Sequence, residues 1–170
     1  MATPFYGTVV GADDYHTERG NTAWTAITDE DAKTAALVVA SEWIDGKYAS
    51  SFGGLKVGQR EQVRQWPRNS AQDRDGYAIA NDAVPVEVEH ATYEAALRQL
   101  AAPGALAVDV TLAQGIREVA VEGAVSVKYA GGSSIYDYQL SIPAVDRAIA
   151  PVLTGASSSS GLVGSTYRAW

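Results

Sequence analysis

The side chains of this sequence that could do chemistry are few and scattered. Its two histidines, His16 and His90, lie far apart in the sequence, and there is no cysteine. His16 follows Asp13 and Asp14, and these residue types could bind a metal ion, but they fit a solvated helix face equally well, which is what we expect. We expect His90 at the packing edge of a helix. The histidines therefore predict neither catalysis nor a metal site.

Other catalytic and cofactor motifs are missing as well. Asp73-Arg74-Asp75-Gly76 is similar to the start of a calcium loop, but it lacks the glutamate required at loop position twelve. No glycine-rich loop ends in Lys-Ser or Lys-Thr, and no serine occupies a nucleophile elbow. An active site built from scattered carboxylates stays open as an alternative. We expect no enzyme, no cofactor and no bound metal.

Composition indicates a globular protein. The chain has 170 residues, of which 46% are hydrophobic and 19% charged, enough for one domain with its own core. Without cysteine it has neither disulfides nor cysteine-ligated zinc. No segment approaches the ~20 apolar residues of a membrane span, and no signal peptide is recognisable, so we expect no membrane partner.

The net charge of −7 disfavours nucleic-acid binding, which usually requires a basic face. Arg60, Arg64 and Arg68 are spaced by four residues, but Pro67 interrupts the helix before the third. We interpret this series as a solvated helix face rather than as a track for phosphates.

The pattern of apolar residues and of breakers predicts a mainly α fold: a small helical bundle with one β-hairpin insertion and an extended C-terminal tail. Helices are predicted over residues 11–19, from a cap at Thr28 to about Tyr48, from Pro85 to about Ala101, and over 143–153. The second helix should bury Ala32, Ala35, Ala36, Val39 and Trp43 on one face, and Leu37, Val38 and Ile44 widen that apolar stripe. The third should bury Val86, Tyr93, Leu97 and Leu100 and carry an ion pair between Glu94 and Arg98. The last should bury Val145 and Ile149.

Alternation of valines near residues 116–129 predicts the hairpin. Because a lone hairpin is marginal in water, it must pack on the helices or join strands of a neighbouring subunit. We expect one helical domain over residues 1–153.

Tryptophans supply the structural anchors. A helix-like run from Gly58 should end at Trp66, because Pro67 cannot continue it. Trp66 would then pack as an anchor while Arg68 points elsewhere. Trp24 and Trp43 are expected to be structural in the same way.

Residues 154–170 form the predicted tail. Glycines and serines up to Gly161 cannot build a core, yet apolar, aromatic and basic residues follow them: Leu162, Val163, Tyr167, Arg168 and Trp170. This order is typical of a tethered docking peptide. A frayed terminus, or one folded back on its own domain, is the alternative.

Several short segments occur in an order that resembles one family. They are Tyr15 to Trp24, Ala35-Ala36-Leu37, Trp43 to Tyr48, Gln62 with Trp66-Pro67-Arg68, Asp75-Gly76-Tyr77, Val84-Pro85, Arg117-Glu118 and Val145-Asp146. The family is found in tailed bacteriophages and is often labelled DnaT-like single-stranded-DNA-binding; its members look like head–tail adaptors.

The resemblance implies a structural connector in the virion neck, made in the host cytoplasm. Its partners would be a portal protein, which the tail residues would bind, a tail or head-closure (stopper) protein, and further copies of itself in a dodecameric ring. DNA would pass through the lumen without specific binding. Two other classes of function stay open: a single-stranded-DNA-binding replication protein, and an unrelated enzyme or soluble interaction domain.

Overall fold

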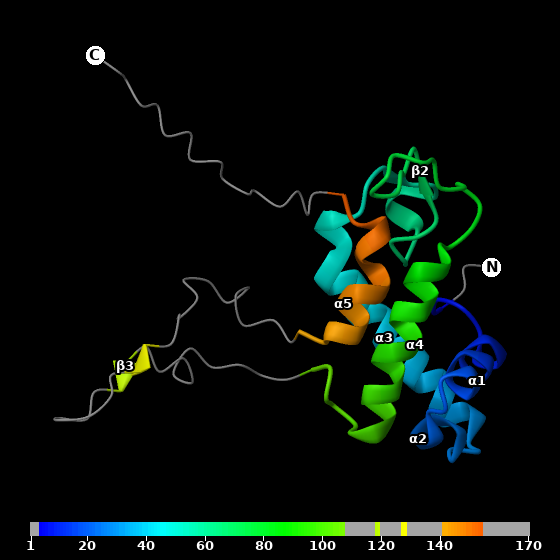
Figure 1. The fold of residues 1–170 in the computed structure, drawn as a ribbon. Coiled ribbons are helices and arrows are strands. Elements are labelled where there is room, and N and C mark those ends of the chain that lie inside the picture. The colour runs from blue at the N-terminus through cyan, green and yellow to red at the C-terminus, as the bar shows by residue number, and fades with distance from the viewer. Residues whose placement is uncertain (1–3, 108–117, 120–126, 129–140, 155–170) are drawn as a thin grey trace.

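The computed structural model describes residues 4–107, 118–119, 127–128 and 141–154 (Figure 1). Three helices form its body: α3 (Glu30–Tyr48), α4 (Val86–Ala101) and α5 (Pro143–Ile149). Helix α4 packs against both α3 and α5, while α1 (Val9–Glu18) and the short α2 (Thr22–Thr25) cover one end (Figure 1). The expected class, mainly α with a β-hairpin, is confirmed.

The first helices begin and end where local chemistry requires it. The hydroxyl of Thr8 caps α1 by accepting from the amide of Gly11, and Gly20 follows the helix with a φ of +64°. The cap of α3 is Asp29, one residue beyond the predicted Thr28. Its carboxylate accepts from the amides of Asp31 and Ala32.

The predicted buried face of α3 is only partly right: Ala36 is buried as expected, but the centre of the face lies toward Leu37 and Ile44. Leu37, Ala40, Ser41 and Ile44 are fully buried, whereas Ala35 is exposed and Ala32, Val39 and Trp43 are only partly covered. Alanines occur on several sides of this helix, so the alanine pattern fits two overlapping faces. The larger Leu37 and Ile44, seven residues apart, decide between them.

Helix α4 starts after Pro85 as predicted, but it buries a different stripe. Val88, Ala91, Thr92, Ala95 and Ala96 are fully covered together with Tyr93, while Leu97 and Leu100 are partly buried and Val86 is exposed. The small residues of α3 and α4 let the two helices approach closely. The predicted ion pair between Glu94 and Arg98 is present.

Helix α5 buries Val145 and Ile149 as predicted. It continues as the 3-10 turn η5 (Ala150–Val152) rather than as an α-helix. Pro151 has no amide hydrogen to donate, which prevents the regular α pattern there.

Two antiparallel strand pairs complete the described structure. Strands β3 (Glu118–Val119) and β4 (Val127–Lys128) form the predicted hairpin. Strands β1 (Leu55–Lys56) and β2 (Arg68–Asn69) form a ladder that the sequence pattern did not predict, with Leu55 opposite Asn69.

The helix predicted to end at Trp66 does not form. The chain from the 3-10 turn η1 (Ala49–Ser51) to helix α4 is mostly loop. The 3-10 turn η2 (Gln59–Glu61) and the short strands β1 and β2 are its only regular elements among the described residues. The Gln62 side chain bonds to nearby backbone instead, accepting from the amide of Gly58 and donating to the carbonyls of Arg64 and Pro67. Such bonds compete with helix formation. We call residues 52–84 the loop lobe.

Candidate functional site

The N-terminal segment holds the loop lobe onto α3 through Tyr6. This side chain is buried, and its hydroxyl accepts from the amides of Gln65 (2.9 Å) and Trp66 (3.2 Å) while donating to the carboxylate of Asp45. Burial raises the pKa of Tyr6, and the charge of Asp45 raises it further. The phenol therefore stays protonated and donates at every physiological pH. One hydroxyl thus connects three segments of the chain.

Arg64 makes a second connection between the same segments. Its Nε donates to the carbonyl of Pro4 (2.8 Å), and its two terminal nitrogens lie 3.4 Å from carboxylate oxygens of Asp45 and Glu42 on α3. The arginine is only 7% exposed, so it is a buried cation with two carboxylate partners. It belongs to the framework and is not available to a ligand.

Arg68 is buried as well and shapes the lobe from inside. Its guanidinium donates to the carbonyls of Gly53 (2.6 Å), Gly54 (2.8 Å) and Gln65 (3.2 Å). Trp66 packs edge-on against Phe52, with 5.5 Å between the ring centres. Trp66 is buried, and its role as an anchor stays a prediction. The series Arg60, Arg64 and Arg68 is neither a solvated helix face nor a phosphate track, because its last two members are buried.

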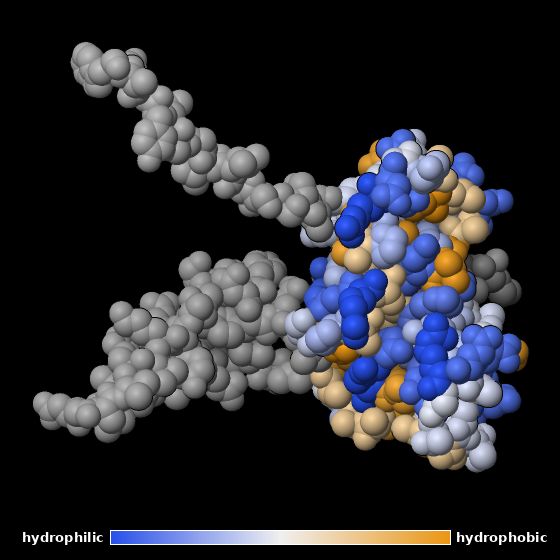
Figure 2. All heavy atoms as spheres, in the orientation of Figure 1, coloured by the Kyte–Doolittle hydropathy of each residue, from blue (hydrophilic) through white to orange (hydrophobic). Residues whose placement is uncertain are grey.

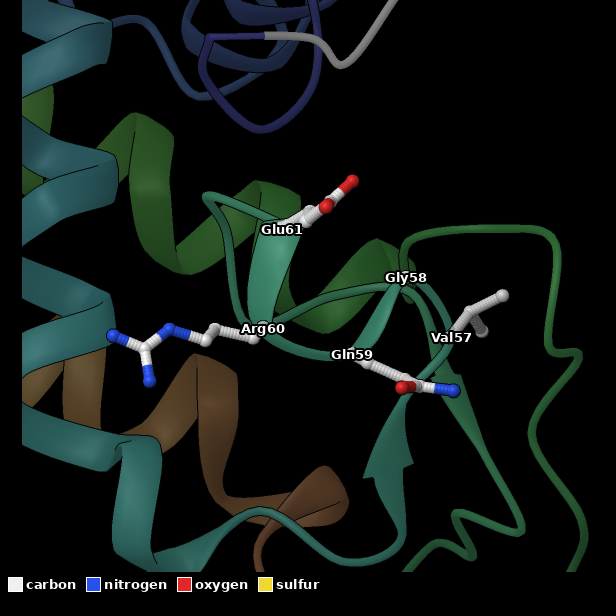
Figure 3. Close-up of a pocket in the computed structure, with 5 residues that line it drawn as sticks. All are labelled: Val57, Gly58, Gln59, Arg60 and Glu61. Carbon is white, nitrogen blue, oxygen red and sulfur yellow. The ribbon is translucent and has the colours of Figure 1, made fainter.

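The turn from Val57 to Glu61 surrounds a hollow of about 400 Å³. Figure 3 shows that Val57, Arg60 and Glu61 project from this turn in different directions and do not converge on its centre. A site for a small molecule would need converging polar groups. Gln59 has a φ of +52°, so the turn keeps a conformation that L side chains rarely adopt. The shape of the turn is therefore set by the loop, and Arg60 is exposed on it.

A second turn presents an aromatic ring. The carboxylate of Asp73 accepts from the amides of Asp75 (3.0 Å) and Tyr77 (2.8 Å), and Gly76 takes a φ of +91° between them. Tyr77 is 72% exposed. The carboxylate of Asp73 orders its own turn, and the described residues contain no group of three or more potential metal ligands. This turn is a support for Tyr77 and not a calcium loop.

The exposed surface of the lobe carries basic and apolar side chains. Arg60 and Arg74 are exposed, and neither makes a side-chain hydrogen bond or ion pair with another described residue. Leu55 and Val63 are 77% and 71% exposed. Figure 2 shows hydrophobic residues beside strongly hydrophilic ones at the top of the molecule, in the region of β2. We call these exposed residues, Leu55, Val57, Arg60, Val63, Arg74 and Tyr77, the lobe face; the name refers to their exposure on the lobe, since Val57 and Arg60 do not point in one direction.

The lobe also differs from the rest of the chain in charge. Of 13 basic and 20 acidic residues, five basic and four acidic lie between residues 52 and 84. The lobe therefore has a formal charge of +1, and the remainder one of −8. Part of the acidic excess is committed to ion pairs; for example, Asp146 lies 2.7 Å from Lys47.

His16 shows that the expected solvated helix face was wrong. It is fully buried; its Nε2 lies 3.2 Å from the carbonyl of Tyr93 and its Nδ1 2.9 Å from the side-chain amide of Asn21. A carbonyl can only accept, so Nε2 carries the proton; the NH2 group of Asn21 can only donate, so Nδ1 accepts and the imidazole is neutral. Burial lowers the pKa of His16, which agrees with this neutral form. The predicted packing edge at His90 is confirmed, since its ring packs on Tyr15.

Asp13 does not serve as a metal ligand either. It accepts hydrogen bonds from Trp24 (2.6 Å) and from the buried Lys33 (2.7 Å). Burial alone would raise the pKa of Asp13, but these hydrogen bonds outweigh it and hold the pKa below its usual value. Trp24 is fully buried and Trp43 only partly; the structural role expected of both stays a prediction.

The predicted tail residues Leu162, Val163, Tyr167, Arg168 and Trp170 lie outside the described residues, and their role in docking stays a prediction. No helix in the described ranges combines the length and the apolar character needed to cross a bilayer.

These features can be compared with those of known proteins. The family model described as "Putative DnaT-like ssDNA binding protein" matches residues 5–169, and the chain belongs to this family. No curated protein and no solved structure matches the chain.

This match corrects the predicted function. The family description concerns single-stranded DNA, and nothing in the match indicates a head–tail adaptor. The predicted connector role is therefore wrong, and so are the portal, the tail or head-closure protein and the dodecameric ring as partners. The lumen that DNA passes without specific binding is withdrawn with them. The connector role was inferred from a resemblance carried by residues such as Trp24, Trp66 and Arg68, which are buried. Buried residues indicate a fold, and a fold does not specify a partner.

Two further predictions stay predictions. Neither the fold nor the family match bears on the location in the virion neck after synthesis in the host cytoplasm. The same holds for the expected lack of enzymatic activity.

Proposed function

We propose that the protein binds single-stranded DNA through the lobe face. The observation that carries this proposal is the family match, which spans residues 5–169. The same function was kept open above as an alternative, against which the acidic composition argued.

The distribution of charge supports the proposal despite the net charge of −7. A phosphate backbone close to the protein responds to the charges nearest to it, because salt screens charges further than about 10 Å away at 0.1 M ionic strength. Arg64 and Arg68 are buried, so the cations that the lobe offers to a phosphate are its exposed Arg60 and Arg74, which make no ion pair with described residues that would have to be broken first. Two phosphate contacts are consistent with weak binding that does not depend on base sequence.

The exposed ring of Tyr77 supplies the other component of such sites. Bases of single strands stack on aromatic side chains, and each stacked base contributes about 1–3 kcal/mol. Asp73 and Gly76 hold the turn below the ring, so little ordering of the backbone is needed when a base binds. Leu55 and Val63 add exposed apolar side chains to the lobe.

The test is the fluorescence anisotropy of a labelled oligothymidylate mixed with the purified chain. We expect Tyr77→Ala to weaken binding by about 5- to 150-fold, the equivalent of one stacked base, and Tyr77→Phe to keep it. Replacing both Arg60 and Arg74 by alanine should weaken binding and flatten its dependence on salt by about 1.4 units of the log–log slope, which is two single-strand phosphate contacts.

The matched control is Arg19→Ala, which removes one exposed arginine at the end of α1, away from the lobe (Figure 1). It should leave the affinity within about twofold once its folding has been checked, because charges beyond a Debye length are screened. Absence of oligonucleotide binding at low and moderate salt would refute the proposed function. Binding that is insensitive to all lobe variants would refute the assignment of the lobe face.

A further inference from the structure

We infer that residues 151–154, which we call the strap, hold the turn of Arg74 and Tyr77 in the position in which it binds DNA. Thr154 is the main positioning residue of the strap. Because the DNA site is itself a proposal, this role of the strap rests on the proposed function.

The strap is fixed to the helical body by buried side chains. Ile149, at the end of α5, and Val152, within the strap, are both buried. Pro151 follows the end of α5, and the chain continues as η5. Because α5 ends at Ile149, the carbonyl of Pro151 lies outside the hydrogen-bond pattern of that helix and is available to another segment. Figure 1 shows α5 running toward the loops around β2.

One end of the strap is paired with the start of the lobe. The amide of Thr154 donates to the carbonyl of Ser51 (2.8 Å), and the hydroxyl of Thr154 donates to the same oxygen (3.1 Å). Leu153 forms an antiparallel bridge with Phe52, the first residue of the lobe. Phe52 packs on Trp66 inside the lobe, so this contact reaches the core of the lobe.

The other end of the strap holds the turn that carries Tyr77. The amide of Arg74 donates to the carbonyl of Pro151 at 2.7 Å. Among the hydrogen bonds between described residues, this is the only one that joins residues 70–84 to a segment outside the lobe. Asp73 and Gly76 set the shape of the turn, whereas the hydrogen bond of the Arg74 amide ties the turn to the body.

This tie affects binding because DNA binds the molecules whose turn is in place. The apparent dissociation constant equals the intrinsic constant divided by the fraction of competent molecules. If release of the strap leaves the turn in place in about one molecule in ten, binding weakens about tenfold without the loss of any DNA contact. By the same linkage, a bound strand favours the docked strap.

Close packing between the strap and the lobe offers a test that keeps Arg60, Arg74 and Tyr77 intact. A Cβ on Gly53 would lie 2.9 Å from Cγ2 of Thr154, so Gly53→Ala must shift the strap against the lobe. Thr154→Ala removes this methyl group and the hydroxyl but keeps the amide that donates to Ser51. Gly53→Ala should therefore harm binding in the wild type more than in the Thr154→Ala chain.

The measurement is the fluorescence anisotropy of a labelled oligothymidylate mixed with full-length variants at about 0.1 M salt. We expect Gly53→Ala to weaken binding about 5- to 10-fold. Adding Gly53→Ala to Thr154→Ala should change the affinity by less than about twofold. Thr154→Pro, which lacks both donors to Ser51, should weaken binding at least as much as Gly53→Ala; Leu153 has φ −91° and ψ 122°, which permits a proline after it.

A control separates positioning from a general loss of stability. Asp29→Ala removes the cap of α3 at the end of that helix opposite the lobe, and it should lower the melting temperature (Figure 1). It should leave the affinity within about twofold, because the strap and the lobe keep their contacts.

Hydrogen exchange gives a readout that a purely structural role would not move. Oligothymidylate should slow the exchange of the Thr154 amide, although this amide donates to Ser51 and not to the strand. In the free protein, Gly53→Ala should speed the exchange of the Arg74 amide, which donates to the strap.

The possible results separate the role of the strap from the proposed function. If the wild type binds and Gly53→Ala binds equally well while Tyr77→Ala is defective, the strap does not position the site and the lobe face stands. A loss in Gly53→Ala that Thr154→Ala does not relieve would also overturn the role of this contact. No binding by the wild type would refute the proposed function, and the role of the strap in DNA binding with it.

Discussion

Replacing Tyr6 by phenylalanine tests whether the loop lobe is held by one buried hydroxyl. The substitution keeps the ring and its packing and removes only the oxygen. That oxygen donates to Asp45 and accepts from the amides of Gln65 and Trp66. The amide of Gln65 keeps a long contact of 3.4 Å with Asp45, whereas no other acceptor is described for the amide of Trp66.

The magnitude follows from these contacts. A buried amide without a partner costs about 1–3 kcal/mol, and a hydrogen bond to a charged group contributes about 1.5–3 kcal/mol. The phenylalanine variant no longer has to desolvate a hydroxyl, which offsets part of the loss. We therefore expect the free energy of unfolding to fall by about 2–4 kcal/mol, or the melting temperature to fall by about 10 °C for a chain of this size.

Equilibrium unfolding in urea, followed by circular dichroism, measures the loss. Native-state hydrogen exchange then shows where it arises, since the amides of Gln65 and Trp66 should exchange faster. Tyr77→Phe is the matched control, because its hydroxyl is exposed and surface changes usually stay within about 0.5 kcal/mol. If Tyr6→Phe also stays within that range and both amides keep their protection, the hydroxyl does not hold the lobe.

Two other predictions concern stability. Burial lowers the pKa of His16, so below pH 6.5 the unfolded chain binds a proton that the folded chain does not. The free energy of unfolding should therefore decrease as the pH is lowered through this range, by up to about 1.4 kcal/mol per pH unit. Urea unfolding at pH 7.5 and at pH 5.5 measures this loss, which should be smaller in His16→Gln. Gly54 and Gly20 have similar φ angles of +68° and +64°, but a Cβ at Gly54 would lie 2.1 Å from the carbonyl of Asn69, whereas at Gly20 it meets nothing within 4 Å. Gly20→Ala should therefore cost about 1–2 kcal/mol and Gly54→Ala about 1–3 kcal/mol more; equal losses in urea unfolding would contradict this account.

The features that could be predicted from the sequence are those set by neighbouring residues. Gly20, Pro85 and Pro143 mark helix boundaries by what their own backbones permit, and the valine alternation around β3 and β4 specifies a hairpin locally. The buried face of α3 was misplaced because alanine fits a buried position and an exposed one equally well.

The lobe could not be predicted because its contacts join distant parts of the chain. Tyr6 meets Gln65, and Thr154 meets Ser51, across separations of 59 and 103 residues. The same reason explains why Arg64 is buried: its carboxylate partners are on α3 and cannot be identified from the spacing of arginines. One signal was present in the sequence, namely that five of 13 basic residues fall between residues 52 and 84.

The separation of charge between the lobe and the rest of the chain leads to a last prediction, which concerns salt. At 0.01 M ionic strength the Debye length is about 30 Å, so a strand on the lobe face is repelled by the −8 of the remainder. At 0.1 M it is about 10 Å, and the repulsion is largely screened while the contacts of Arg60 and Arg74 persist; still higher salt weakens these contacts too. The affinity for oligothymidylate should therefore pass through a maximum at intermediate salt, between about 0.02 and 0.1 M.

Anisotropy titrations across this range measure the affinity, and the Arg60→Ala, Arg74→Ala double variant should lose the maximum because only repulsion remains. An affinity that decreases steadily from the lowest salt upwards would show that the strand contacts a surface other than the lobe face, or that the acidic remainder lies further from the strand than this fold places it.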